Sequence, residues 1–218
     1  MELTRQIDAY CERMDPGYWA EPVNAVTNLA FIIAAIVLWR RTAGDGMARA
    51  LCVVVFCIGL GSYLFHTHAQ VWSAIADVVP IGAFILLYLY AINRDGWGLR
   101  GWRALVLTAL YVPYAALTVP LFGLIPGLGS SAGYAPVPLL ILIYAFLLRR
   151  RAPVLARGMA IGAGILIVSL TFRTIDIPLC DALPLGTHFA WHLLNGLMLG
   201  WMIAVYHAHR LGNSAGAR

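Results

Sequence analysis

Seven long apolar runs constrain what this chain can fold into more than any other feature. A helix that crosses a membrane needs about 20 consecutive, mainly apolar residues. Such runs lie at residues 21–39, 48–66, 71–92, 102–122, 134–149, 157–172 and 187–207. The connections between them are too short to fold separately. The sequence therefore predicts an all-α integral membrane protein, built as a seven-helix transmembrane bundle.

The composition excludes a soluble enzyme. Charged residues make up 11% of the 218 residues and apolar residues 61%, whereas a soluble domain has about a quarter of its residues charged. All 15 basic residues are arginines, scattered between the apolar runs, so nucleic acid is not expected as a partner. We expect an extracytoplasmic amino-terminal segment at 1–20, the bundle at 21–210 and a short cytoplasmic tail at 211–218.

The arginines predict the orientation, because basic residues in short loops are retained on the cytoplasmic side. Twelve of the 15 fall on one side of a seven-span topology, and only Arg5, Arg13 and Arg173 fall on the other. The acidic start of the chain does not resemble a signal peptide, whose start is basic. We expect the amino terminus outside and the carboxyl terminus in the cytoplasm.

Polar side chains within the apolar runs are costly and mark candidate functional residues. Ser62 and His66 are four residues apart at the end of the second run, so they share a helix face. His188 and His192 have the same spacing at the start of the seventh run. Asp77 lies among apolar neighbours in the third run. In the predicted topology His66, Asp77 and both members of the His188 pair lie toward the outer end of the bundle, with Ser62 one turn deeper.

Three imidazoles, with a fourth position left to water, form an open zinc site of the catalytic type. His66, His188 and His192 are the predicted ligands. Such an ion lowers the pKa of its bound water to about 7 and polarises a carbonyl oxygen, as hydrolysis of an unreactive amide or ester requires. Asp77 would take the proton from that water and return it to the leaving group. The alternative is that the histidines simply bridge neighbouring helices.

In combination, these motifs resemble those of the alkaline ceramidases, members of a superfamily of membrane hydrolases that includes the adiponectin and progestin-type receptors. The run Tyr10-Cys11-Glu12-Arg13 and the segment from Trp19 to Asn28 are similar to the amino-terminal signature of the ceramidase branch. The resemblance implies a catalytic zinc on the three histidines, with Asp77 acting on the attacking water and Ser62 assisting at the zinc-bound oxygen. The implied substrate is a ceramide-like lipid amide in the membrane, cleaved to a fatty acid and an amine base.

The resemblance also implies a calcium site just before the first span. Glu12 and Glu21 match acidic positions of the family. Asp8 is a looser match, because the run from Asp8 to Glu12 is one residue longer than the corresponding run of the family. Carboxylates supply the oxygen ligands that calcium prefers. The alternative is an acidic outer tail that merely follows the charge rule.

The four cysteines fall into two groups. Cys52 and Cys57 lie within the second run and are expected to be buried thiols. Cys11 and Cys180 both fall on the outer side, which is oxidising in a periplasm or lumen. We predict a Cys11–Cys180 disulfide that ties the amino-terminal segment to the loop between the sixth and seventh spans.

Two other classes of function deserve comparison. A receptor or regulatory protein of the adiponectin-receptor type would use the zinc mainly as a structural ion, and the pair Glu12 and Glu21 favours the ceramidase branch over it. A transporter would need polar residues along the whole membrane thickness, whereas here they cluster at one end.

Trp191, near a span end, is typical of an aromatic belt.

Overall fold

The computed structural model describes residues 2–215, which are almost entirely helical and contain no β-strand beyond an isolated bridge between Gln6 and Gln70. The elements are α1 (Pro22–Thr27), α2 (Leu29–Arg41), α3 (Gly46–His68), α4 (Val71–Ala91), η1 (Ile92–Gly96), α5 (Gly101–Ala109), α6 (Tyr111–Gly123), η2 (Gly129–Gly133), α7 (Pro136–Leu148), α8 (Pro153–Ile175), η3 (Ile177–Leu179) and α9 (His188–Ala215).

Seven helical stretches among these residues are long and apolar enough to cross a membrane, as predicted. They run over Pro22–Arg41, Gly46–His68, Val71–Gly96, Gly101–Gly123, Gly129–Leu148, Pro153–Ile175 and His188–Gly212. Because α9 continues to Ala215, the predicted tail at 211–218 begins inside this helix, and residues 216–218 lie outside the described part of the chain.

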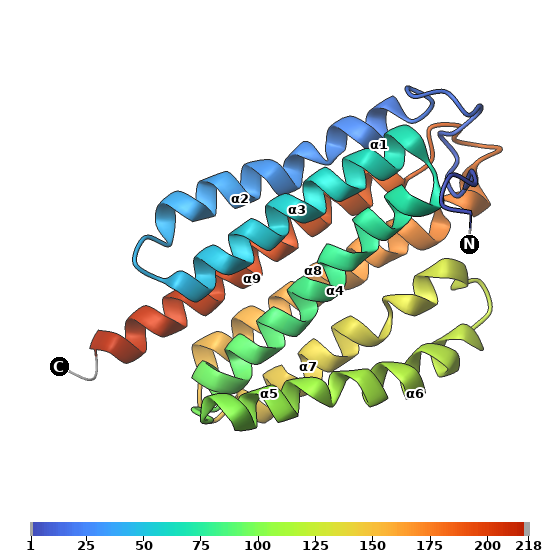
Figure 1. The fold of residues 1–218 in the computed structure, drawn as a ribbon. Coiled ribbons are helices and arrows are strands. Elements are labelled where there is room, and N and C mark those ends of the chain that lie inside the picture. Colours follow the sequence, from blue (N-terminus) through green and yellow to red (C-terminus); the bar gives the residue numbers. More distant parts are fainter. Residues whose placement is uncertain (1, 216–218) are drawn as a thin grey trace.

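The helices form a ring around an elongated core (Figure 1). Around the ring, neighbouring helices follow the order α4, α3, α2, α9, α8 and α7. The pair of helices α5 and α6 then closes the ring between α7 and α4. Small residues allow the closest approaches, since a Cβ atom at Gly61 would collide with the backbone carbonyl of Ala76. This contact brings α3 and α4 together beside Ser62 and Asp77.

One prediction about the free cysteines is wrong. Cys52 is buried, but Cys57 is exposed on the outer surface of the bundle. Two side chains that are five positions apart in an α-helix point about 140° away from each other around the helix axis. The two thiols therefore lie on different faces of α3, and only that of Cys52 meets the core.

The amino-terminal segment crosses one end of the bundle, where Figure 1 shows it beside the connection between α8 and α9. The Ile7 amide donates to the Ala69 carbonyl at 2.7 Å, which ties the segment to the turn between α3 and α4. Cys11 and Cys180 form a disulfide with a Cα–Cα distance of 5.3 Å, which confirms the predicted pairing. The histidines lie beneath this cap.

Candidate metal centre

His66, His188 and His192 converge at the end of the bundle that the amino-terminal segment covers. His66 lies near the end of α3, and the other two occupy the first two turns of α9. Their ring centroids are 4.6 to 5.2 Å apart, and one nitrogen of each lies within 4.8 Å of the other two. All three side chains are buried. The predicted ligands therefore form one compact cluster of nitrogen donors.

Unpaired nitrogens in this cluster fit a metal ion. Nδ1 of His188 and Nε2 of His192 are buried, and neither has a hydrogen-bond partner among residues 2–215. A buried polar atom without a partner costs free energy, because it has lost its bonds to water. A divalent cation would satisfy both nitrogens, and imidazole is a common ligand of zinc.

Thr27 fixes the orientation of the His192 ring. The hydroxyl of Thr27 donates to the carbonyls of Val23 or Asn24, at 2.8 and 3.0 Å, so its oxygen accepts from Nδ1 of His192 at 3.0 Å. This tautomer leaves the lone pair of Nε2 free. Partners of this kind orient metal-ligating imidazoles in many proteins.

Glu21 has the same relationship to His66. Its Oε2 lies 2.6 Å from Nδ1 of His66, and its Oε1 accepts from Nε of Arg13 at 2.5 Å. Burial raises the pKa of the Glu21 carboxyl, but the hydrogen bonds from His66 and Arg13, together with the charge of Arg13, bring that pKa below its usual value. Glu21 is therefore an ionised partner that leaves Nε2 of His66 for a metal.

Asp176 and Tyr10 hold the start of α9. Oδ1 of Asp176 accepts from the amides of Thr187 and His188, at 2.6 and 2.9 Å, and Oδ2 accepts from the amide of Cys11 at 3.1 Å. A carboxylate at this end of a helix is favoured by the helix dipole. The Tyr10 ring stacks on His188 with centroids 3.6 Å apart. The amino-terminal segment thus helps to place His188.

Asp77 and Ser62 lie beside the cluster and line the same cavity. The two helices approach closely here, since a Cβ atom at Gly61 would lie 3.2 Å from Cα of Asp77, and Asp77 interacts electrostatically with His66. The predicted acid and hydroxyl are therefore next to each other and close to one candidate metal ligand.

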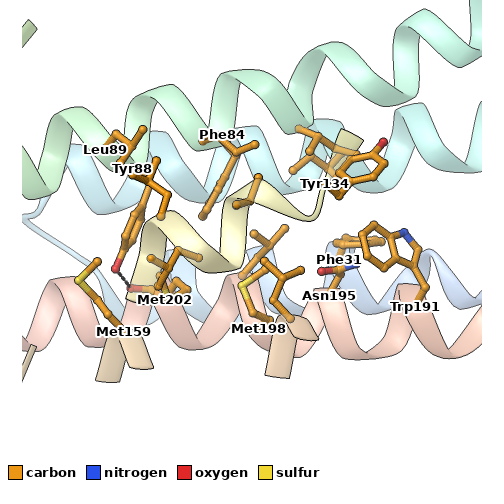
Figure 2. Close-up of a pocket in the computed structure, with 18 of the residues that line it drawn as sticks. Phe31, Phe84, Tyr88, Leu89, Tyr134, Met159, Trp191, Asn195, Met198 and Met202 are labelled. Carbon is orange, nitrogen blue, oxygen red and sulfur yellow. Dashed lines mark hydrogen bonds between the residues drawn. The ribbon is translucent and has the colours of Figure 1, made fainter. Parts of the chain in front are cut away.

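An apolar cavity of about 90 Å³ extends from these two residues into the bundle. Figure 2 shows its long axis following α9, with Trp191 and Asn195 at one end and Met202 at the other. At the inner end the Tyr88 hydroxyl donates to the carbonyl of Met202 at 3.3 Å. The lining is almost wholly apolar, as a site for a hydrocarbon chain requires.

Trp191 does not belong to an aromatic belt, contrary to the sequence-based expectation. It is 8% exposed, lines the cavity and packs against Tyr134. The position of Trp191 near the end of a span suggested a residue at the membrane interface. The face of α9 that carries Trp191, however, points into the ring of helices. The Arg173 guanidinium lies 5.0 Å from the Tyr134 ring and 5.7 Å from the Trp191 ring, so an arginine of α8 lies at the Trp191 end of this cavity.

The residues expected to bind calcium do not form an open oxygen cage. The two carboxylate oxygens of Glu12 accept from the amides of Val23 and Asn24, at 2.7 and 2.8 Å. Burial raises the pKa of the Glu12 carboxyl despite these bonds. Both oxygens of Glu21 are also occupied, and Asp8 is exposed, with no side-chain hydrogen bond to another described residue. These three residues therefore do not fit calcium as the structure arranges them.

Several residues of the site were not recognised from the sequence. Thr27, Arg13 and Asp176 each contact a part of the chain far away in sequence, and Tyr10 was noted only as part of a motif. Glu21 was singled out, but as a calcium ligand and not as the partner of His66. The one signal in the sequence that could have pointed to such residues was the position of a polar residue just before an apolar run.

These features define a multi-pass membrane protein with a buried three-histidine centre and an apolar cavity, lined in part by Ser62 and Asp77, that suits a lipid chain. A sequence model of the Ceramidase family matches residues 6–216, nearly the whole chain. The protein belongs to the Ceramidase family, which implies an amidohydrolase acting on a lipid amide. No curated protein matches the chain significantly.

Proposed function

We propose that the protein hydrolyses the amide bond of a ceramide-like membrane lipid, and that the reaction requires zinc held by His66, His188 and His192. One observation carries the proposal: three buried imidazoles, two of them with unpaired nitrogens, form one cluster, and Asp77, which interacts electrostatically with His66, lines an apolar cavity. Membership of the Ceramidase family supports the same reaction.

The metal would supply one part of the chemistry. Zinc on three imidazoles lowers the pKa of a coordinated water and polarises a carbonyl oxygen. The protein's own contribution is to hold these ligands in place, through Glu21 at His66 and Thr27 at His192.

Asp77 and Ser62 would handle the proton and the developing charge. Asp77 accepts a proton from the attacking water as the water oxygen bonds to the amide carbon. Ser62 donates a hydrogen bond to the amide oxygen as negative charge grows on it. Asp77 then gives the proton to the nitrogen as the carbon–nitrogen bond breaks. The products are a fatty acid and a free amine base.

The cavity would hold the acyl chain. Met202 lies eleven positions after Trp191 in α9, which is about 16 Å along the helix axis. Since carbon–carbon bonds of about 1.5 Å advance a zigzag chain by about 1.3 Å each, roughly a dozen methylenes fill this length. A long-chain lipid amide therefore suits the cavity better than a short one.

The arginine distribution supports an orientation with the amino terminus outside, so that the amide bond would be cleaved near the outer boundary of the membrane. The acyl chain then lies among the helices, and the polar head of the lipid remains at the boundary. The seven-span topology supports this arrangement because the three histidines and Asp77 share one end of the bundle.

The test is release of fatty acid from labelled ceramides by the purified protein. Asp77→Ala and His192→Ala should abolish release while the helical fold stays intact. His68→Ala is the matched control, since His68 lies two residues from His66 but outside the metal cluster. Undiminished hydrolysis by either of the first two variants would overturn the mechanism. No turnover of any lipid, together with loss of thermal stability on chelation, would favour the receptor-like alternative.

A further inference from the structure

Arg13 is a buried cation at the centre of the outer cap. Its side chain is 4% exposed, and its guanidinium donates to four oxygen atoms. The acceptors are Oε1 of Glu21 at 2.5 Å and the carbonyls of His66, Asp15 and Gly17 at 3.1, 3.1 and 3.4 Å. These oxygens come from the amino-terminal segment, the start of the first span and the end of α3, so one side chain joins three parts of the chain.

The acceptor set is of the kind that calcium binds. Calcium takes carboxylate and backbone carbonyl oxygens, and Arg13 takes one carboxylate oxygen and three carbonyl oxygens. The carbonyl of His66 belongs to the last turn of α3, where carbonyls lack partners within the helix and a cation is favoured by the helix dipole. The guanidinium therefore already supplies the positive charge that this cluster requires.

A divalent ion would have to displace the guanidinium. A buried charge without a partner is strongly unfavourable, and Arg13 with Glu21 already forms a closely bonded pair. Glu12 is also occupied, because both of its oxygens accept backbone amides at the start of α1. The two buried acids before the first span, Glu12 and Glu21, thus have their hydrogen bonds satisfied by the chain itself.

We propose that Arg13 is a built-in cation that takes the place of calcium in this protein and positions the metal ligand His66 through Glu21. Arg13 holds Oε1 of Glu21, and this leaves Oε2 against Nδ1 of His66. Arg13 also holds the carbonyl of the same histidine, so both the ring and the backbone of His66 are fixed from one residue. The role rests on the proposed metal site but not on the identity of the substrate.

The first test is calorimetric titration of the wild-type protein with calcium chloride in calcium-free buffer, together with its melting temperature with and without calcium. We expect no stoichiometric binding at millimolar calcium and no shift in melting temperature. Binding of one calcium per chain that is lost in Glu21→Gln would overturn the proposal. This arm needs no arginine variant, so it decides the question even if such variants fail to fold.

The second test is zinc affinity, measured by competition with a chromophoric chelator and without any lipid. Arg13→Met, which keeps the length of the side chain and removes its charge, should weaken zinc binding about tenfold or more. Arg13→Lys should lie between this variant and the wild type, because one ammonium group cannot serve all four oxygens. Arg5→Met is the matched control, an exposed arginine of the same segment.

A double variant separates positioning from general destabilisation. If Arg13 acts through Glu21, Arg13→Met combined with Glu21→Gln should bind zinc no more weakly than Glu21→Gln alone. Fully additive losses, or wild-type zinc affinity in Arg13→Met, would contradict the proposal. Since every readout is ion binding or melting, a failure of lipid hydrolysis would leave these results unaffected.

Discussion

Oε2 of Glu21 lies 2.6 Å from Nδ1 of His66. An acidic residue just before the first span is thus the hydrogen-bond partner of a candidate metal ligand near the end of α3. The contact decides which nitrogen of His66 faces the cluster, because a donor at Nδ1 leaves Nε2 unprotonated. It also couples the amino-terminal cap to the centre that the proposed reaction uses.

Glu21→Gln tests this contact. The amide still fits the space but lacks the charge that holds the imidazole, so we expect zinc affinity to fall by about 10- to 100-fold. Competition with a chelator of known affinity measures the change. Glu2→Gln, at an exposed position of the same segment, is the control and should bind zinc as the wild type does. Equal affinities in the two variants would show that Glu21 does not orient His66.

Thr27→Val tests the partner of His192. Valine has nearly the same shape as threonine but no oxygen to accept from Nδ1, so we again expect weaker zinc binding, by about tenfold. Thr67→Val is the matched control, since the hydroxyl of Thr67 donates to carbonyls of its own helix, Tyr63 and Leu64. The idea fails if Thr67→Val loses as much zinc affinity as Thr27→Val.

The disulfide should stabilise the cap. Cys11 and Cys180 are 169 residues apart in sequence, and a cross-link over so long a loop removes much conformational freedom from the unfolded chain. Replacing both with serine should lower the free energy of unfolding by about 2 to 4 kcal/mol. Thermal melts in detergent with and without reductant provide the measurement. An unchanged melt, or mass spectra of the native protein with both thiols free, would refute this prediction.

The cavity should select the length of the acyl chain. Met198 lies between the two ends of the α9 lining, so Met198→Trp would shorten the space available to a hydrocarbon chain. We expect release of long-chain fatty acids to fall at least tenfold relative to short-chain ones. Leu197→Trp is the control, because Leu197 is 59% exposed on the outside of the bundle. A chain-length profile that Met198→Trp leaves unchanged would mean that the acyl chain binds elsewhere.

Local patterns in the sequence predict the seven spans and the histidine cluster. Hydropathy over about 20 residues identifies a membrane helix, and a spacing of four places His188 and His192 on one face. The topology then brings His66 to the same end. Even the disulfide follows from this reasoning, because Cys11 and Cys180 lie on one side of the membrane.

The contacts that surround the centre cannot be predicted in this way. From the sequence, Arg13 was only one of the three arginines on the minority side of the predicted topology. In the structure its buried side chain donates to the carbonyl of His66. Asp176 could be known only as an acid in a loop, although it accepts from the amide of Cys11 at 3.1 Å. Such bonds depend on how irregular segments fold over one another, and neither hydropathy nor helical periodicity reports on that.

We propose that Asp77 performs proton transfer at a metal centre that it does not build. Fatty acid release and bound zinc, measured on the same sample of Asp77→Asn, test it most directly. Asp181→Asn, an exposed acid of the outer connection, is the control. We predict that Asp77→Asn retains one zinc per chain and loses hydrolysis by at least a hundredfold, while Asp181→Asn keeps both. Hydrolysis at the wild-type rate by zinc-loaded Asp77→Asn would contradict the account.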